Sequence, residues 1–320
     1  GKPFLGHTSL PRPHQCTSPA QEFWDLYEGK ELTLPDNADY DMEGKAPHLR
    51  KSAERWRKGE WTLIEPKTFE AGRLRKLRGY LGAVSQVDHA VGLMLDFLRE
   101  NGLAENTIVV YGADHGDYAC EHGIMEKAPG ICSDAITRVP FIWWGPEAFK
   151  AGHVAEEIAE LVDVPNTLCG LAGLDLLETA DGRDISHLLR GESGEVHRVG
   201  VTEFAWSKSL RRGKYRLVHY PPDMFPQEYP NGFGELYDLE ADPWEMKNLY
   251  FDPGFQKIVE EMRLEMLHWL ITNTRPGTVL QASNKLAAGS QSVERYHCVT
   301  NLDGKIHPDR LREIAGGNYL

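Results

Sequence analysis

The sequence predicts an α/β fold with a mainly parallel sheet flanked by helices, followed by a smaller antiparallel α+β subdomain. Apolar runs at residues 107–112 and 139–144, typical of buried strands, alternate with segments of helical periodicity. Beyond residue 190 the strand-like segments become short and are separated by turn residues. We therefore expect three parts: residues 1–190, residues 191–273, and a tail of unknown role, residues 274–320.

The composition is that of a globular chain without a membrane span. Of the 320 residues, 41% are hydrophobic and 26% are charged, and no run approaches the roughly 18 apolar residues of a membrane helix. The net charge of −13 argues against binding nucleic acid, although residues 50–78 carry ten basic and four acidic residues, a local +6. Five scattered cysteines without a C-x-x-C pair indicate neither a disulfide framework nor a zinc site.

The first part begins abruptly. The chain opens without an initiator Met or a leader, and residues 3–9 predict a core strand, so we expect a piece of a longer chain. Pro11 and Pro13 end that strand, and a short helix over residues 19–27 follows, with Ser18 as its N-cap. Residues 28–68 are polar and rich in Pro and Gly, which predicts a long excursion over the surface.

The strongest predicted helix covers residues 69–101. Its apolar residues recur at steps of three and four along one face and are Tyr80, Val84, Val87, Val91, Met94, Leu95 and Leu98. The runs at residues 107–112 and 139–144 predict strands buried on both faces. A helix is expected over residues 164–172, capped by Asp163. In the second part we expect strands at residues 199–204, 215–220 and 235–239 and a helix at residues 255–271.

Polar side chains with metal-binding and catalytic chemistry follow two of the predicted strands. Asp114 and His115 come directly after residues 107–112, and in open α/β sheets ligands bind at the carboxyl ends of strands. A carboxylate beside an imidazole suits a divalent cation, whereas a capped turn is the structural alternative. Lys127 would offer a charge to an anionic substrate, or be a solvated loop lysine. His14 would serve as a general acid, or only as a hydrogen-bonding residue.

Several blocks of sequence, in consistent order, carry a resemblance to one family. The first blocks are Lys2-Pro3-Phe4-Leu5 with Arg12-Pro13-His14, followed by Tyr80, Val84-Ser85-Gln86-Val87-Asp88 and residues 102–110. The central block is Ala113-Asp114-His115-Gly116-Asp117 with Glu121-His122-Gly123, Lys127 and Arg138-Val139-Pro140. The last blocks are Asp181-Gly182-Arg183-Asp184, Leu188-Leu189-Arg190-Gly191, Glu235-Leu236-Tyr237-Asp238-Leu239, Asp242-Pro243 and Asn248-Leu249. In these blocks the chain resembles the sulfatases of the alkaline phosphatase superfamily.

The resemblance implies an alkaline phosphatase-like fold and hydrolysis of a sulfate ester in a sulfated sugar or an aryl sulfate. It implies that Asp114 and His115 are two ligands of a divalent metal ion, with calcium as the expected ion. Lys127 would contact the sulfate group and its bridging oxygen, His14 would assist the departing alcohol, and His122 would join them in binding substrate. Such groups suit the reaction because sulfate transfer builds negative charge on peripheral and leaving oxygens. A secreted, periplasmic or lysosomal location is also implied.

The sequence departs from the family at the nucleophile. The family uses a cysteine or serine in Cys/Ser-x-Pro-x-Arg, converted to formylglycine, whereas Cys16 precedes Thr17-Ser18-Pro19-Ala20 and Ser9-Leu10-Pro11-Arg12-Pro13 places the arginine one position early. The paired aspartates that supply further metal ligands are also absent, and Ser133-Asp134 stands where Tyr-Glu is usual. We therefore expect a fragment that is inactive alone. It would associate with a second chain carrying the N-terminal part, or with copies of itself, because unpaired strand edges promote association.

Two other functions remain open at this point. One is a phosphodiesterase or phosphonate monoesterase of the same superfamily, which the missing nucleophile segment would distinguish. The other is a catalytically inactive, sulfatase-like binding protein, which an initiator codon immediately before Gly1 would favour.

Overall fold

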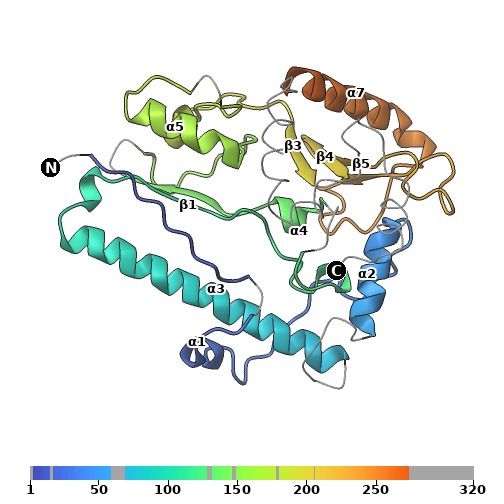
Figure 1. The fold of residues 1–320 in the computed structure, drawn as a ribbon, viewed down its shortest axis with the longest axis horizontal. Helices are drawn as coiled ribbons and strands as arrows, with labels where there is room; N and C mark the ends of the chain where they lie inside the picture. The colour runs from blue at the N-terminus through green and yellow to red at the C-terminus, as the bar shows by residue number, and fades with distance from the viewer. Residues whose placement is uncertain are drawn as a thin grey trace, which may run out of the picture.

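The computed structural model describes residues 3–14, 17–58, 69–127, 132–145, 149–177, 180–204 and 206–273 (Figure 1). The helices are α1 (Gln21–Asp25), α2 (Pro47–Arg57), α3 (Phe69–Glu100), α4 (Asp134–Thr137), α5 (Val164–Leu171), α6 (Ser186–Leu189) and α7 (Gln256–Asn273), and the 3-10 turns are η1 (Ala104–Asn106), η2 (Glu121–Gly123), η3 (Leu161–Asp163) and η4 (Pro253–Phe255). The strands are β1 (Val109–Gly112), β2 (Phe141–Trp144), β3 (Gly200–Phe204), β4 (Ser207–Arg212), β5 (Tyr215–His219) and β6 (Gly234–Asp238). No helix in these ranges is both long and apolar enough to cross a bilayer.

The strands form two separate sheets, and both are antiparallel. β1 pairs with β2, so that Val109 lies opposite Trp144 and Gly112 opposite Phe141. The mainly parallel sheet that the alternating pattern predicts is therefore not formed by the described strands, and β1 and β2 are half-buried rather than buried on both faces. Apolar runs identify strands but not their direction, which depends here on the connection through η2 and α4 that turns the chain back.

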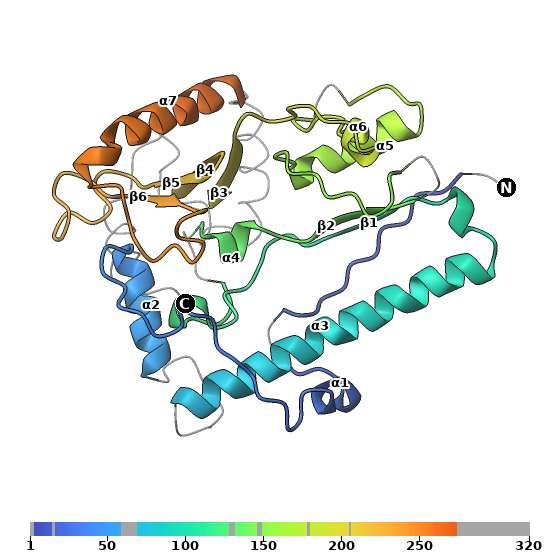
Figure 2. The same ribbon diagram turned by 180° about the vertical axis from the view of Figure 1, so that it is seen from behind.

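The N-terminal residues do not form the predicted core strand. Residues 3–10 have no regular structure, and the ribbon views draw them as an irregular coil between α3 and β1 (Figures 1 and 2). Phe4 and Leu5 are 69% and 86% exposed. The pattern was strand-like, but a strand exists only where a neighbouring strand accepts and donates its backbone hydrogen bonds, and none of the described strands pairs with this segment.

The predicted surface excursion instead contributes to the main core. Within it α2 buries Leu49, Ala53 and Trp56 against Tyr118 and Ile124. Ala46 and these three residues follow one another at steps of three and four, an amphipathic pattern that the many charges of this segment obscure. The sequence interpretation was wrong here because it weighed polarity above periodicity.

The helix predictions around α3 are confirmed. α3 covers Phe69–Glu100, and α1 packs on it where two glycines allow close approach: a Cβ on Gly79 would lie 2.2 Å from the Thr17 carbonyl oxygen. The N-cap residue of α1 is Ala20 rather than the predicted Ser18. α5 also forms as predicted, although Asp163 makes no capping hydrogen bond to it.

The C-terminal part is the predicted antiparallel sheet with one covering helix. β3 to β6 pair in sequence order, and α7 packs on the sheet through Val259, Met262 and Met266 against leucines of β4, β5 and β6 (Figure 2). β4 was not predicted because Ser207-Lys208-Ser209-Leu210-Arg211-Arg212 contains a single apolar residue. The tail, residues 274–320, lies outside the described residues, and the division into three parts stays a prediction.

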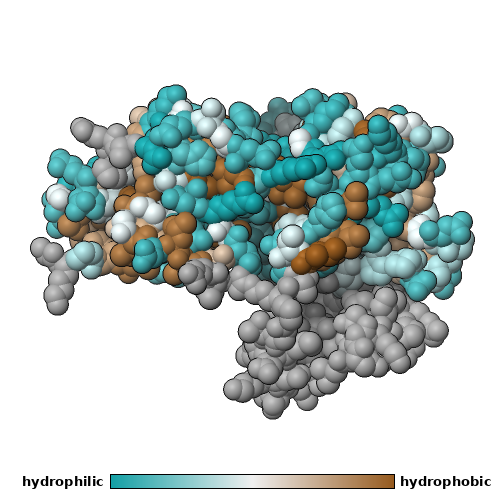
Figure 3. Space-filling view, turned by 90° about the horizontal axis from the view of Figure 1, so that it is seen from above, coloured by the Kyte–Doolittle hydropathy of each residue, from teal (hydrophilic) through white to brown (hydrophobic). Residues whose placement is uncertain are grey.

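Apolar side chains also reach the surface. Seen from above, polar residues cover most of the face and apolar ones gather in a few patches (Figure 3). The most exposed large apolar side chains, at half or more, are Phe4, Leu5, Leu26, Leu93, Phe97, Ile142, Val154, Leu174, Phe251, Leu264, Leu267 and Ile271. These residues are spread over several elements.

Candidate functional site

The segment after β1 is anchored by its backbone. The Gly116 N–H donates to the Ile136 carbonyl oxygen at 2.8 Å, and a Cβ on Gly116 would lie 1.9 Å from the Ala135 carbonyl oxygen. A glycine is therefore required where this segment passes α4. Upstream of this contact, the Asp114 side chain is 88% exposed and accepts a hydrogen bond from the His115 N–H at 3.0 Å.

Three of the predicted site residues lie together at this point. The Lys127 Nζ is 2.9 Å from His115 Nε2, and Asp114 Oδ2 is 3.6 Å from the same nitrogen. His115 Nδ1 is 2.7 Å from the Gly116 carbonyl oxygen, an acceptor, so Nδ1 carries the proton and Nε2 accepts from the lysine. Two opposite charges and a neutral imidazole thus meet at one exposed point beyond the carboxyl end of β1.

The residues present fit part of a metal site. The hydrogen bond from His115 Nδ1 to a backbone carbonyl is the usual support of a metal-binding histidine, but the Nε2 lone pair here accepts from the Lys127 ammonium, so Lys127 has to release it before a cation can bind at this nitrogen. The exposed Asp114 carboxylate is the second donor. Within the described residues no group of three or more His, Cys, Asp or Glu side chains is placed to hold an ion, and calcium takes six to eight oxygen ligands. Asp114 and His115 would therefore supply only two of the ligands, and their assignment as metal ligands stays a prediction.

Lys127 follows a loop that is held by its own hydrogen bonds. Asp117 Oδ1 accepts from the N–H groups of Ala119 (2.8 Å) and Glu126 (3.0 Å), and Glu126 pairs with Lys76 of α3 at 3.1 Å. Burial raises the pKa of Asp117, while these two backbone hydrogen bonds oppose the rise. The loop therefore leaves the core in a fixed conformation immediately before the lysine.

His122 is placed differently from the other site candidates. Its side chain is only 1% exposed and lies between Tyr40 and Tyr118, with edge-on ring contacts at 5.5 and 5.9 Å. Burial, with a smaller contribution from the charge of Lys45, holds the pKa of His122 well below its usual range. The substrate contact implied by the resemblance is not supported by this burial.

His14 lies in an exposed position in the N-terminal segment. It follows the cis Arg12–Pro13 peptide bond, and its N–H donates to the Pro11 carbonyl oxygen at 3.1 Å. Its assignment as a general acid stays a prediction.

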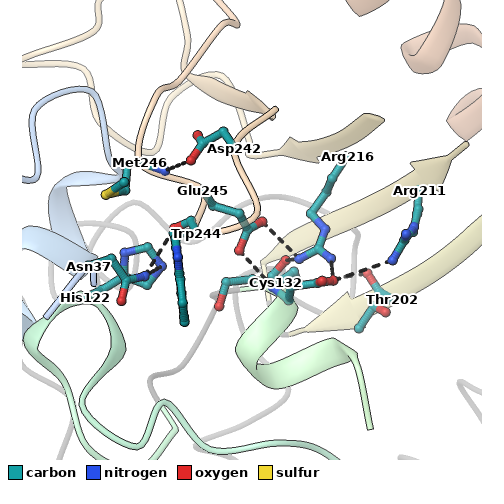
Figure 4. Close-up of polar contacts among 12 residues, drawn as sticks. Asn37, His122, Cys132, Thr202, Arg211, Arg216, Asp242, Trp244, Glu245 and Met246 are labelled. Carbon is teal, nitrogen blue, oxygen red and sulfur yellow. Dashed lines mark hydrogen bonds and ion pairs between the residues drawn. The ribbon is translucent and has the colours of Figure 1, made fainter. Parts of the chain in front are cut away.

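The structure also brings together residues to which the sequence assigned no role (Figure 4). The guanidinium of Arg216 in β5 pairs with Asp134 of α4 and, at 3.1 Å, with Glu245, and it donates to the Cys132 carbonyl oxygen at 3.0 Å. Glu245 Oε2 in turn accepts from the Asp134 N–H at 2.8 Å. Arg216 and Glu245 are 2% and 3% exposed, so this is a buried ionic contact between the four-stranded sheet and the segment that follows Lys127. Sequence patterns treat charged residues as surface residues and give no signal for such a contact.

Two family models match the chain. The model described as "Sulfatase" matches residues 1–174, and the model described as "N-sulphoglucosamine sulphohydrolase, C-terminal" matches residues 120–271. The first match covers more than half of the chain and includes Asp114, His115 and Lys127. The second covers the four-stranded sheet and α7.

Individual proteins give the same result. The chain is 26% identical over 265 residues to an arylsulfatase of Clostridium perfringens, covering 82% of this chain and 52% of the relative. It is 32% identical over 193 residues to a Delta 4,5-hexuronate-2-O-sulfatase of Bacteroides thetaiotaomicron, covering 58% of this chain and 40% of the relative. The chain thus spans about half the length of the curated relatives that it matches.

A solved structure confirms the expected fold class. A protein in complex with its substrate D-glucosamine-2-N,6-O-disulfate has a TM-score of 0.68 to this chain at 21% identity, covering 81% of this chain and 63% of the other. At this identity the likeness concerns the fold alone. It supports the α/β architecture with a C-terminal antiparallel subdomain that the sequence predicts.

Proposed function

The chain belongs to the sulfatase family, and from that premise we propose that it supplies the metal- and sulfate-binding side of a sulfuric ester hydrolase. The observation that supports this most directly is the cluster at the end of β1, where Lys127 lies 2.9 Å from His115 and Asp114 lies beside both. An exposed ammonium and a partly formed cation site are the groups that a transferring sulfate requires.

We propose a sulfated sugar as the substrate. The relatives include an N-acetylglucosamine-6-O-sulfatase of Bacteroides thetaiotaomicron, 28% identical over 205 residues, besides the hexuronate sulfatase named above. When the sulfate group is transferred, the bond from sulfur to the sugar oxygen breaks and the sugar departs as an alkoxide unless an acid protonates that oxygen. His14 is our candidate for that acid, and Lys127 would hold the sulfate group and its bridging oxygen.

Sulfatases generally depend on a metal ion, and we propose a divalent cation here, calcium, with Asp114 and His115 among its ligands. The bound cation would neutralise charge on the sulfate oxygens. The chain's own contribution is to hold the His115 ring in one tautomer through the Gly116 carbonyl oxygen and to keep Lys127 next to the site, where its ammonium would turn from His115 Nε2 to the sulfate group once the cation takes that nitrogen.

The remaining parts of such an enzyme must come from elsewhere. The 320 residues contain no Cys/Ser-x-Pro-x-Arg segment, so we propose that the formylglycine nucleophile and further metal ligands lie on polypeptide outside them, in the same protein or in a second chain. Exposed apolar residues such as Leu93 and Phe97 on α3 and Ile142 on β2 are candidates for contacts with that polypeptide, or with a copy of this chain.

A second candidate within the superfamily is a phosphonate monoester hydrolase. A phosphonate monoester hydrolase of Agrobacterium radiobacter has a TM-score of 0.53 to this chain at 22% identity. Hydrolysis by the nucleophile-containing protein of a sulfated glucosamine and of a phosphonate monoester, assayed side by side, tests the proposal. We expect the sulfate ester to have the larger kcat/KM, and a preference for the phosphonate would favour the second candidate.

The role of Lys127 gives the sharpest test of the site. In the nucleophile-containing protein, Lys127→Ala should lower kcat by roughly 10²–10³, the scale of losing one preorganised charge-stabilising donor. KM should change less, because charge builds up in the transition state. Lys150→Ala, at an exposed lysine in a loop, is the matched control and should be near neutral. Equal, small effects of both substitutions would remove Lys127 from the site.

A further inference from the structure

The loop that precedes Lys127 is unusual in its backbone. Of the five non-glycine residues with positive φ in the described chain, four lie within residues 119–126: Ala119 (44°), Cys120 (82°), His122 (52°) and Glu126 (73°). Left-handed conformations of non-glycine residues carry strain and persist only where the surroundings hold them. The conformation of residues 119–126 therefore depends on contacts from outside the loop.

His122 is one of several residues that connect this loop to the rest of the protein, beside the Glu126–Lys76 ion pair and the buried side chains of Tyr118 and Ile124, and it is the one held by hydrogen bonds at both ring nitrogens (Figure 4). Its Nε2 is 3.3 Å from Asn37 Nδ2, and its Nδ1 is 3.1 Å from the Tyr40 hydroxyl. The Asn37 amide also donates to the Trp244 carbonyl oxygen at 3.2 Å, which fixes Nδ2 as the atom that faces the imidazole. The imidazole must therefore accept at Nε2 and donate from Nδ1 to Tyr40, so the ring is neutral and held at both nitrogens.

The loop that contains His122 and leads to Lys127 is cross-linked by internal hydrogen bonds. The Tyr118 N–H donates to the Glu126 carbonyl oxygen at 3.1 Å, and Asp117 clamps Ala119 and Glu126. The Cys120 N–H donates to the Ile124 carbonyl oxygen at 2.9 Å. These hydrogen bonds join the two ends of the loop on either side of His122, so we expect a shift at His122 to displace Lys127 at the C-terminal end of the loop as well.

We propose that His122 is a positioning residue: the Asn37–His122–Tyr40 contact sets the strained loop 117–127 in place and so holds the Lys127 ammonium against His115. The importance of that placement for sulfate transfer rests on the proposed function, but the placement itself does not. The proposal replaces a direct contact between His122 and substrate, for which the buried ring is badly placed.

The test compares two buried histidines by NMR of the 320-residue chain. His122→Ala should alter the ring ¹⁵N resonances of His115, because the Nε2 atom loses its ammonium donor. It should also speed amide exchange at Cys120 and Ile124 roughly tenfold, as expected when about one buried hydrogen bond no longer opposes opening. His48→Ala, at an equally buried histidine that stacks on Phe225, should lower the melting temperature without either change. A folded His122→Ala protein with wild-type His115 resonances would overturn the proposal.

Two further measurements keep the proposal testable if His122→Ala does not fold. Asn37→Asp has the same shape but removes the donor to His122 Nε2, and it should produce the same changes at His115. In the wild-type protein the ¹⁵N resonances of His122 should report the Nδ1–H tautomer, and the Nε2–H tautomer would refute the arrangement. None of these readouts involves sulfate. If the protein binds or hydrolyses no sulfate ester while His115 still responds to His122, only the proposed function fails.

Discussion

Asp163 shows how a single buried carboxylate joins three segments of the chain. The residue is completely buried, and its two oxygens accept from the Glu160 N–H, the Arg183 N–H and His197 Nε2 at 2.8 to 2.9 Å. Burial alone would raise the pKa of Asp163, but these hydrogen bonds outweigh it and hold the pKa below its usual value. The sequence predicted Asp163 as a helix cap, whereas in the structure its carboxylate links the segments of Glu160, Arg183 and His197 through hydrogen bonds.

The depressed pKa predicts how stability depends on pH. Because the folded pKa lies below the unfolded value of about 3.9, the stabilisation from Asp163 is fully present above about pH 4 and is lost as the pH falls through the folded pKa. Asp163→Asn should lower the free energy of unfolding by about 1–3 kcal/mol at neutral pH. Urea unfolding at several pH values measures this, and the difference from wild type should shrink below about pH 4. A difference that is constant with pH would contradict the assignment.

At the scale of elements, α3 depends on glycine for one contact and merely tolerates it elsewhere. Gly79 faces the Thr17 carbonyl oxygen, and Gly82 faces Pro19 and the Phe23 carbonyl oxygen, so α1 and its N-terminal approach lie directly on the helix backbone. Gly92, on the same helix, has no atom within 4 Å of the position a Cβ would take. The two environments predict opposite effects of one substitution.

Gly79→Ala should destabilise the protein, because a Cβ 2.2 Å from a backbone oxygen forces α1 away from α3. Gly92→Ala should stabilise it by up to about 1 kcal/mol, the difference in helix propensity between the two residues. Thermal unfolding of both variants measures the contrast. A gain in melting temperature for both would mean that the α1–α3 contact is loose.

For the whole molecule, the ionic contact of Arg216 joins the four-stranded sheet to the α4 segment. Removing the buried guanidinium, which satisfies Asp134, Glu245 and the Cys132 carbonyl oxygen, leaves the Glu245 carboxylate without this ion pair and Asp134 with only a longer contact to Arg211 at 3.8 Å. Removing one partner of a buried ion pair is far more costly than removing an exposed one. Stability of the whole chain should therefore be sensitive to this residue.

Arg216→Met should lower the free energy of unfolding by roughly 3–5 kcal/mol. Arg212→Met, on the adjacent strand β4, removes a more exposed ion pair to Glu261 of α7 and should cost about 0–1 kcal/mol. Urea unfolding followed by circular dichroism measures both. Similar, small losses for the two variants would show that the buried contact adds nothing to stability.

The sequence by itself determined the features that local chemistry encodes. The periodicity of residues 69–101, the β-branched run before Asp114 and the turn-separated strands beyond residue 190 each predicted an element that the structure contains. The order of the blocks around Asp114, His115 and Lys127 carried the resemblance to the sulfatases, and the match of the family model over residues 1–174 confirmed it.

Only the tertiary structure decided the features that depend on what lies beside a segment. Residues 3–9 have a strand pattern but no partner among the described strands, and β1 pairs antiparallel because the chain turns back through α4. His122 and Arg216 are polar but buried, because Asn37 and Glu245 satisfy their polar atoms. These partners are far away in the sequence, so no local pattern predicted the contacts. A hydrogen bond or an ion pair between distant residues leaves no periodic signal, whereas desolvation makes it decisive once the chain has folded.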